Sequence, residues 1–372
     1  MHAAPGRPPF RADHIGSLLR PPRLRQAFRD RAAGTLGEDD FRRIQDESIR
    51  EAVRLQQEAG LAVVTDGEFR RGSYWSRFVE RTEGLSVRDA RFNFRDEHGH
   101  EQSFTAPHVV GRLRRSQPIA LDEFAFLREI GATLTPKITL PSPSTMHFWR
   151  GAAYAEPGLY ADPAAFFDDL AAVYRAEIAE LARAGCRYLQ LDEVALAMLC
   201  DAAARERIAA DGGDPEALAH LYVDAINAAV AGHPPELVIG VHLCRGNFKG
   251  KYLAEGGYDA IAETLFQRAE VSHFLLEFDT PRAGDFAPLR LVPKAKGVVL
   301  GLVSTKTPAI EPLDLLRRRV DEAARHLDLA RLALSPQCGF ASTVAGNPVT
   351  EAVERAKLGR VVEAARLIWG TA

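Results

Sequence analysis

The feature that most constrains the fold of this 372-residue chain is a repeat of short apolar runs separated by longer amphipathic segments. Apolar runs of about four to eight residues are typical of buried strands, and the segments between them have the periodicity of helices. We place eight strands, near residues 14, 63, 136, 190, 240, 275, 300 and 333. Repeated strand–helix units favour a parallel sheet, and eight of them predict a (β/α)8 TIM barrel. We expect residues 1–372 to form this barrel as a single domain.

An open, doubly wound sheet is the alternative arrangement of such units. The chain has no Gly-x-Gly-x-x-Gly motif after its first predicted strand, so a dinucleotide-binding fold has no support. The main predicted helices span residues 38–59, 163–184, 194–209, 215–231, 312–326 and 350–368. Gly60 directly follows the first of these helices, at the position of a left-handed C-cap residue.

Residues 85–116 interrupt the alternation of strands and helices. Two apolar stretches, 87–94 and 105–112, flank a polar turn at 96–100 and predict a β-hairpin insertion over the mouth of the barrel. The two histidines in this turn could bind a metal, but a solvent-exposed turn is the simpler interpretation. Residues 1–10 are predicted to form a disordered or loosely packed arm.

Titratable side chains gather at the predicted carboxyl ends of the strands, where the active site of a TIM barrel lies. Successive residues of a strand alternate between its two faces, so His242 and Cys244 point the same way. Glu277 ends the strand near residue 275, and Cys338 follows the strand near residue 333. Other titratable residues at such ends are Glu68, Asp192, Glu193 and Lys306.

One imidazole, two thiolates and one carboxylate form a donor set that suits Zn²⁺. Glu277 supports this interpretation, because an unpaired carboxylate on an apolar strand is costly to bury. Four protein ligands resemble a structural zinc site. The position at a barrel mouth favours another hypothesis, in which a substrate thiol replaces a weak ligand. Zinc keeps such a sulfur as a nucleophilic thiolate at neutral pH, which predicts thiol alkylation.

The composition excludes several classes of function. A net charge of -3 gives no reason to expect nucleic acid or an anionic membrane as a partner. No run of about eighteen apolar residues predicts a membrane span, and the first residues lack the apolar core of a signal peptide. Four cysteines do not make a disulfide scaffold, so a cytoplasmic location is predicted. Cys186 and Cys200 have no suitable partners beside them and are expected to be small buried hydrophobic residues.

The predicted zinc ligands resemble those in the catalytic, C-terminal half of cobalamin-independent methionine synthase. That half is a barrel of the same superfamily as uroporphyrinogen decarboxylase, and the likeness extends over almost the whole chain. In the family a His-x-Cys pair, a glutamate and a later cysteine bind zinc. The matching residues, in the same order, are His242, Cys244, Glu277 and Cys338. The resemblance implies a zinc-dependent thiol S-methyltransferase that methylates homocysteine to methionine, with a small methyl donor such as 5-methyltetrahydrofolate.

The resemblance also implies residues for homocysteine. Ile15, Gly16 and Ser17 match an Ile-Gly-Ser segment that holds this substrate in the family. Glu68 matches the glutamate of a Gly-Glu pair that binds the amino group of the substrate. Asp192 matches an aspartate that contacts the same group.

The chain departs from the family in the part that would use folate. Trp149 matches a tryptophan that stacks on the pteridine, although ordinary packing would also explain an aromatic residue there. Lys306 takes the place of a histidine that acts as the acid; a lysine can donate a proton, but its unperturbed pKa differs. An acidic folate contact falls at Met198, and the proline after the Asp-Glu pair is Val194. The chain has no counterpart of the N-terminal barrel of the full-length enzyme. The methyl donor therefore stays open, and a corrinoid is another candidate.

Two further hypotheses remain. Epoxyalkane:coenzyme M transferases have a similar metal motif, and in them a zinc-bound thiol opens an epoxide. Lys306 and Arg245 would then serve a different anionic group. The last hypothesis is a non-catalytic barrel that zinc stabilises. The sequence does not indicate an oligomeric state.

Overall fold

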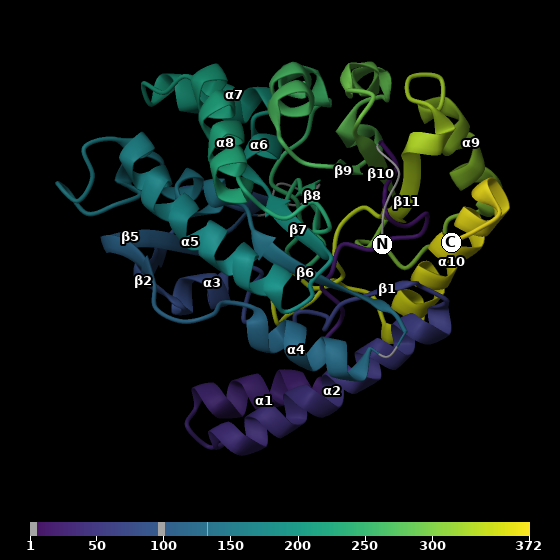
Figure 1. Cartoon of the computed structure of the whole chain (residues 1–372), viewed down its shortest axis with the longest axis horizontal. Helices are drawn as coiled ribbons and strands as arrows, with labels where there is room; N and C mark the ends of the chain where they lie inside the picture. Colours follow the sequence, from purple (N-terminus) through teal and green to yellow (C-terminus); the bar gives the residue numbers. More distant parts are fainter. Residues whose placement is uncertain (1–5, 96–100, 132) are drawn as a thin grey trace.

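A curled sheet of seven parallel strands forms the centre of the molecule, with helices around it (Figure 1). The computed structural model describes residues 6–95, 101–131 and 133–372. The strand order is β1-β6-β7-β8-β9-β10-β11. Their bounds are β1 (Val63–Val64), β6 (Thr135–Pro141), β7 (Tyr188–Glu193), β8 (Val238–Leu243), β9 (His273–Glu277), β10 (Gly297–Val303) and β11 (Leu332–Pro336). All seven coincide with strands expected from the sequence.

The first expected strand, near residue 14, is reduced to a single bridge. Ala12 forms a parallel bridge with Leu334 of β11. The Asp13 N–H donates to the Leu334 carbonyl at 2.9 Å, and the Leu334 N–H donates to the Arg11 carbonyl at 2.9 Å. The described part of the N-terminal segment thus lies beside β11 but pairs with it through one bridge and not as a continuous strand.

The helices mostly follow the expected pattern. Their bounds are α1 (Pro22–Ala32), α2 (Glu38–Ala59), α3 (Ser76–Glu80), α4 (Leu121–Ile130), α5 (Pro163–Arg183), α6 (Ala195–Met198), α7 (Ala202–Ala210), α8 (Pro215–Val230), α9 (Leu313–Ala323) and α10 (Glu351–Trp369). Gly60 has φ 86° and ends α2 as a left-handed C-cap, which confirms that prediction.

Four helical regions correct the sequence interpretation. The helix expected at 194–209 is two helices, α6 and α7, because the Asp201 side chain accepts hydrogen bonds from the N–H groups of Ala203 and Ala204 and begins α7 there. Helix α1 was not among the predicted helices; Pro22 occupies its first position, where a missing N–H costs nothing. Helices α3 and α4 were also missed.

The chain between α3 and α4 forms antiparallel strand pairs that are separate from the central sheet. Strands β2 (Thr82–Asp89) and β5 (Thr105–Arg115) pair over most of their length, and β3 (Phe94–Arg95) pairs with β4 (Glu101–Gln102). The second strand begins where it was predicted, but the first begins at Thr82 instead of residue 87. The turn at 96–100, with its two histidines, lies outside the described residues, as do residues 1–5 of the arm expected at 1–10.

The central strands are buried because helices and loops cover them. Every residue of β9, β10 and β11 is buried, as is typical of parallel sheets that are protected on both faces. Leu275, Val299 and Ala333 occupy matching positions on these three strands and pack together with Ile15. This contact brings the N-terminal segment against the strands that carry the candidate site.

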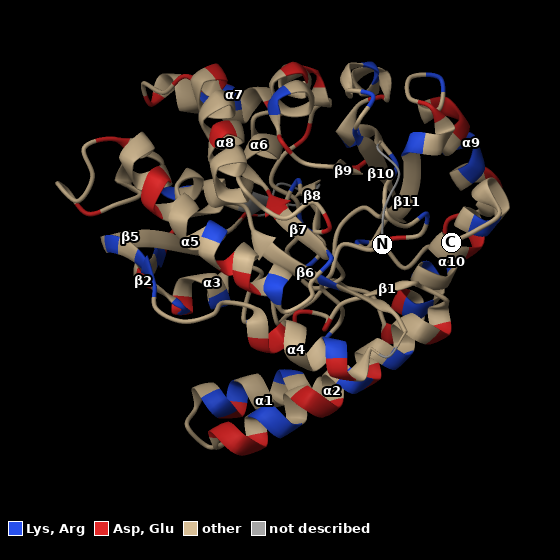
Figure 2. Ribbon diagram, viewed as in Figure 1, with Lys and Arg blue, Asp and Glu red and all other residues tan. Residues whose placement is uncertain are grey.

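Charged side chains lie mainly on the surrounding helices, and in Figure 2 both signs are interspersed along α1 and α2. Within the described part of the chain, no helix is both long enough and apolar enough to cross a membrane.

Candidate active site

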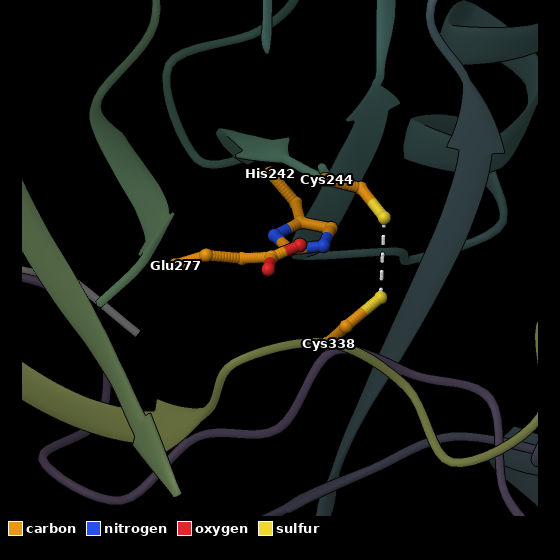
Figure 3. Close-up of side chains that lie close together, drawn as sticks. All are labelled: His242, Cys244, Glu277 and Cys338. Atoms are coloured by element: carbon orange, nitrogen blue, oxygen red, sulfur yellow. Dashed lines mark hydrogen bonds between the residues drawn. The ribbon is translucent and has the colours of Figure 1, made fainter. Parts of the chain in front are cut away.

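The four predicted metal ligands converge at the carboxyl ends of three strands (Figure 3). His242 lies in β8, Cys244 directly follows that strand, Glu277 is the last residue of β9, and Cys338 follows β11. One ligand atom from each side chain lies within 4.8 Å of the other three, and all four residues are buried. The Sγ atoms of Cys244 and Cys338 are 3.3 Å apart. Residues that are far apart in sequence therefore form one compact donor set.

Hydrogen bonds to the backbone orient this donor set. His242 Nδ1 lies 3.1 Å from the Leu275 carbonyl oxygen, which requires the proton on Nδ1 and leaves Nε2 as an acceptor. The buried Nε2 atom has no hydrogen-bond partner among the described residues. The Glu277 Oε1 atom accepts from the Arg245 N–H at 2.7 Å. Metal-binding histidines typically donate the N–H of the other ring nitrogen to a carbonyl, and metal-binding carboxylates are typically hydrogen-bonded. His242 and Glu277 both show this arrangement.

The ionisation of the ligands depends on their mutual contacts. The hydrogen bond from the Cys244 thiol lowers the pKa of the Cys338 thiol well below its usual range, and although burial opposes this, His242 adds to it. Burial raises the pKa of Glu277 to about 7, although the Lys306 ammonium acts in the opposite direction. The group thus stabilises a thiolate on Cys338, and a bound cation would favour the deprotonated form of every ligand, which is a thiolate, a carboxylate or a neutral imidazole.

A cavity of about 500 Å³ lies beside the donor set. Eight of the residues singled out from the sequence line it: Ile15, Ser17, Glu68, Trp149, Asp192, His242, Cys244 and Cys338. Its wall, as far as the structure describes it, contains two carboxylates but no lysine or arginine. The cavity therefore offers negative charge and metal ligands to whatever enters it.

Glu68 and Asp192 supply the two carboxylates. Glu68 has φ 61°, an unusual backbone conformation for a residue other than glycine, and its Oε1 accepts from Thr139 Oγ1 at 2.7 Å. Asp192 Oδ1 accepts from Gln190 Nε2 at 2.7 Å. Burial, followed by repulsion from Glu68, raises the pKa of Asp192 to about 7. Two acidic groups that repel each other in one cavity favour a positively charged ligand group between them.

The segment around Gly16 fits closely against these acids. Gly16 has φ +133°, and a Cβ atom there would lie 2.8 Å from Thr139 Cγ2 and 3.3 Å from Glu68 Oε1. Any larger residue would push this segment away from Glu68. The Thr65 hydroxyl donates to the Gly16 carbonyl at 2.6 Å and holds it in place.

Trp149 combines a cavity position with extensive packing. Its ring is 3% exposed and makes edge contacts with Phe92, Phe104 and Phe148 at centroid distances of 6.1, 5.2 and 5.3 Å. Phe104 lines the same cavity and adjoins β5, so the antiparallel pair reaches the cavity wall. The geometry is compatible with both interpretations of Trp149.

Three of the titratable residues singled out from the sequence are absent from the described cavity lining: Glu277, Lys306 and Glu193. Lys306 is absent from the described lining, and its Nζ atom is 3.9 Å from Glu277 Oε2. Although burial opposes the charged form, Glu277 and then Asp279 raise the pKa of Lys306. Glu193 accepts hydrogen bonds from Ser144 Oγ at 2.6 Å and from the Leu196 N–H at 2.8 Å, so it supports the start of α6.

The remaining cysteines behave as expected. Cys186 and Cys200 are free, buried and outside the donor set. Burial raises the pKa of Cys186 to about 12 and that of Cys200 to about 11, which keeps both as thiols.

Residues 10–367 match the family model for the catalytic domain of cobalamin-independent synthase. The chain belongs to this family. Membership confirms the resemblance that the site residues indicated, and the family model extends over nearly the whole chain.

Relatives of this synthase-family chain include proteins from bacteria and archaea. The uncharacterized protein YxjH of Bacillus subtilis is 41% identical over 364 residues, which are 97% of this chain and 95% of that protein. Methionine synthase of Pyrococcus abyssi is 26% identical over 326 residues, or 88% of this chain and 85% of that protein.

Solved structures agree with the fold. A Listeria monocytogenes protein, provisionally named a vitamin-B12-independent methionine synthase, superimposes with a TM-score of 0.77 at 31% identity, covering 97% of this chain and 98% of that one. A B12-independent methionine synthase from a Shewanella species, solved with selenomethionine, has a TM-score of 0.72 at 21% identity, covering 96% and 97%. The second comparison supports the fold alone.

Sequence reasoning missed several residues of this synthase-family site. Tyr74, Phe104, Asn247 and Phe248 also line the cavity. Asn247 and Phe248 lie only three and four residues after Cys244, so their proximity could have been inferred from the strand end. Tyr74 and Phe104 had no such signal, because they lie in loops whose conformation strand and helix periodicity does not predict. Gln190 lies two residues before Asp192 on the same strand face, and the period of two could have indicated it.

Proposed function

We propose that this chain is a zinc-dependent methyltransferase that transfers a methyl group to the thiol of homocysteine to give methionine. The donor would be 5-methyltetrahydrofolate or another methyl carrier. The observation that carries the proposal is one cavity whose wall contains three members of the donor set, His242, Cys244 and Cys338, together with the two carboxylates of Glu68 and Asp192. A thiol that also carries an ammonium group matches both halves of this cavity.

The donor set fits zinc. His242 offers an unpartnered buried nitrogen, Cys244 and Cys338 offer sulfur, and Glu277 offers oxygen, which together are ligand types that zinc accepts. When bound, zinc would supply a thiolate that is stable at neutral pH. The Leu275 carbonyl and the Arg245 N–H would keep the histidine and glutamate ligands oriented.

The protein residues would hold homocysteine while the methyl group moves. Glu68 and Asp192 would hold its ammonium group, and the segment 15–17 would close against it. A sulfur–carbon bond forms as the bond between the methyl group and the donor nitrogen breaks, and that nitrogen keeps the electron pair and takes up a proton. Trp149 would position the donor.

Lys306 was proposed from the sequence as the source of this proton. Its contact with Glu277 and its raised pKa support a role in balancing the charge of Glu277 more than a role as an acid toward the cavity. Both roles are separable by experiment, as described below.

The charge of the cavity wall supports a thiol with an amino group, such as homocysteine, over a thiol of the coenzyme M type, which has no amino group. A sulfonate would need a cationic partner, but Arg245 and Lys306 lie outside the described lining. Arg245 is buried beneath Tyr258, with its guanidinium carbon 4.5 Å from the centre of that ring. The acidic wall therefore supports an amino thiol.

The finer architecture belongs to the same proposal. We infer that residues 11–14 occupy the eighth position of a TIM barrel, that residues 85–116 are an insertion at its mouth, and that the chain forms one catalytic domain. The bridge of Ala12 to β11 and the position of Phe104 in the cavity wall support these inferences.

The test is mass-spectrometric detection of methionine from homocysteine with zinc-loaded protein. Methyltetrahydrofolate with one or several glutamates is the first donor, and methylcobalamin is the second. The proposal is supported if the wild type forms methionine and the Cys244→Ser variant does not. If homocysteine binds but neither donor gives methionine, the proposal of methyl transfer from these donors to homocysteine is wrong.

A further inference from the structure

A buried amide links two parts of the cavity wall that are far apart in sequence. Gln190 lies in β7 and is fully buried. Its Nε2 atom donates to the Ile15 carbonyl at 2.7 Å and to Asp192 Oδ1 at 2.7 Å. Both hydrogens of the amide are therefore used, one on the N-terminal segment and one on the acid of the cavity.

Lys137 sets the orientation of this amide. Its buried ammonium lies 3.0 Å from Gln190 Oε1 and 2.8 Å from Asp13 Oδ1, and it also contacts the His14 carbonyl. An ammonium group only donates hydrogen bonds, so the oxygen of the Gln190 amide must face Lys137. The NH₂ group is then forced toward Ile15 and Asp192. All three donors of Lys137 and all polar atoms of the amide have partners.

We propose that Gln190, oriented by Lys137, is the positioning residue that sets the amino-group site for an amino-thiol substrate. It fastens Asp192 through one carboxylate oxygen and leaves the other for the ammonium group. It also holds the Ile15 carbonyl, which keeps the segment 15–17 against Glu68. This inference rests on the proposed function, since it specifies how that function would select a thiol with an amino group.

The experiment measures binding of homocysteine and of 4-sulfanylbutanoate, the same thiol without the amino group, by calorimetry on zinc-loaded protein. Gln190→Glu keeps an acceptor for Lys137 but cannot donate to Ile15 or Asp192. Gln190→Met serves as the second variant if the first fails to fold. Gln45→Met is the matched control, because Gln45 is a buried glutamine that donates to the Phe69 carbonyl and lies outside the described cavity lining.

We expect Gln190→Glu to weaken homocysteine binding about 10- to 100-fold, the range for a hydrogen bond to a charged group. The thiol without the amino group should lose less than about threefold, and zinc content should not change. Gln190→Met should show the same larger loss for homocysteine than for the thiol without the amino group, whereas Gln45→Met should match the wild type.

Three outcomes would overturn the inference. Equal losses for both thiols would mean a general distortion of the cavity, and unchanged affinity would mean that the amide has no role in binding. If the wild type binds the thiol without the amino group as tightly as homocysteine, the amino-group site itself is absent. That last result would refute the proposed amino-thiol substrate, whereas the first two leave it intact.

Discussion

Replacement of Cys338 by serine tests the proposed metal centre most directly. Cys338 is 3% exposed and is the member of the donor set that follows β11, whereas His242 and Glu277 lie in β8 and β9 and Cys244 directly follows β8. The variant keeps the shape of the side chain but removes one of two sulfur donors. We expect the purified variant to lose most of its zinc.

The size of the effect follows from what smaller changes do to zinc sites. Loss of a residue that only orients a ligand costs about 10- to 100-fold in metal affinity, so loss of a ligand should cost at least about 100-fold. A 100-fold loss removes about 2.7 kcal/mol of stabilisation by saturating zinc. At roughly 2.1 cal/mol/K of unfolding entropy per residue, this corresponds to about 3 °C in Tm.

The assay combines zinc content after dialysis against a chelator with Tm at several zinc concentrations. Cys200→Ser is the matched control, because Cys200 is a free thiol of similar burial that lies outside the donor set. The wild type and Cys200→Ser should keep about one zinc per chain, as a four-ligand site predicts. Zinc content and a zinc-dependent Tm that are unchanged in Cys338→Ser would refute the assignment.

Three other predictions concern the cavity and its surroundings. Because the pKa of Asp192 is raised to about 7, its carboxylate is protonated below that pH, and the affinity for homocysteine should fall about tenfold per pH unit there. Calorimetry should show no such fall for 4-sulfanylbutanoate. The same pH dependence for both thiols would contradict this prediction. Trp149→Leu should raise the KM of the methyl donor about three- to tenfold, the value of one aromatic contact, and leave the KM of homocysteine unchanged. A loss of Tm without any change in KM would instead assign Trp149 to packing. Lys306→Met should raise the pKa of Glu277, so that zinc, measured in pH titrations, is released at a higher pH than in the wild type. A titration that matches the wild type, together with slower methyl transfer, would favour the acid role.

The sequence by itself determined the elements with strong local signals. Seven strands and the bounds of α2 follow from apolar periodicity and from the glycine that ends the helix, because these signals act over a few neighbouring residues. The shared direction of His242 and Cys244 follows from the period of a strand. The order of donor residues along strand ends was sufficient to indicate the family.

Only the tertiary structure decided which side chains face the cavity. Asp192 and Glu193 are neighbours in sequence, yet Asp192 lines the cavity and Glu193 holds the start of α6. The reduction of the first strand to one bridge depends on how that segment fits beside β11. Lys306 contacts Glu277 instead of the cavity, and Gln190 joins Ile15 to Asp192. These relations depend on the curl and register of the sheet, which bring together residues that no local periodicity connects.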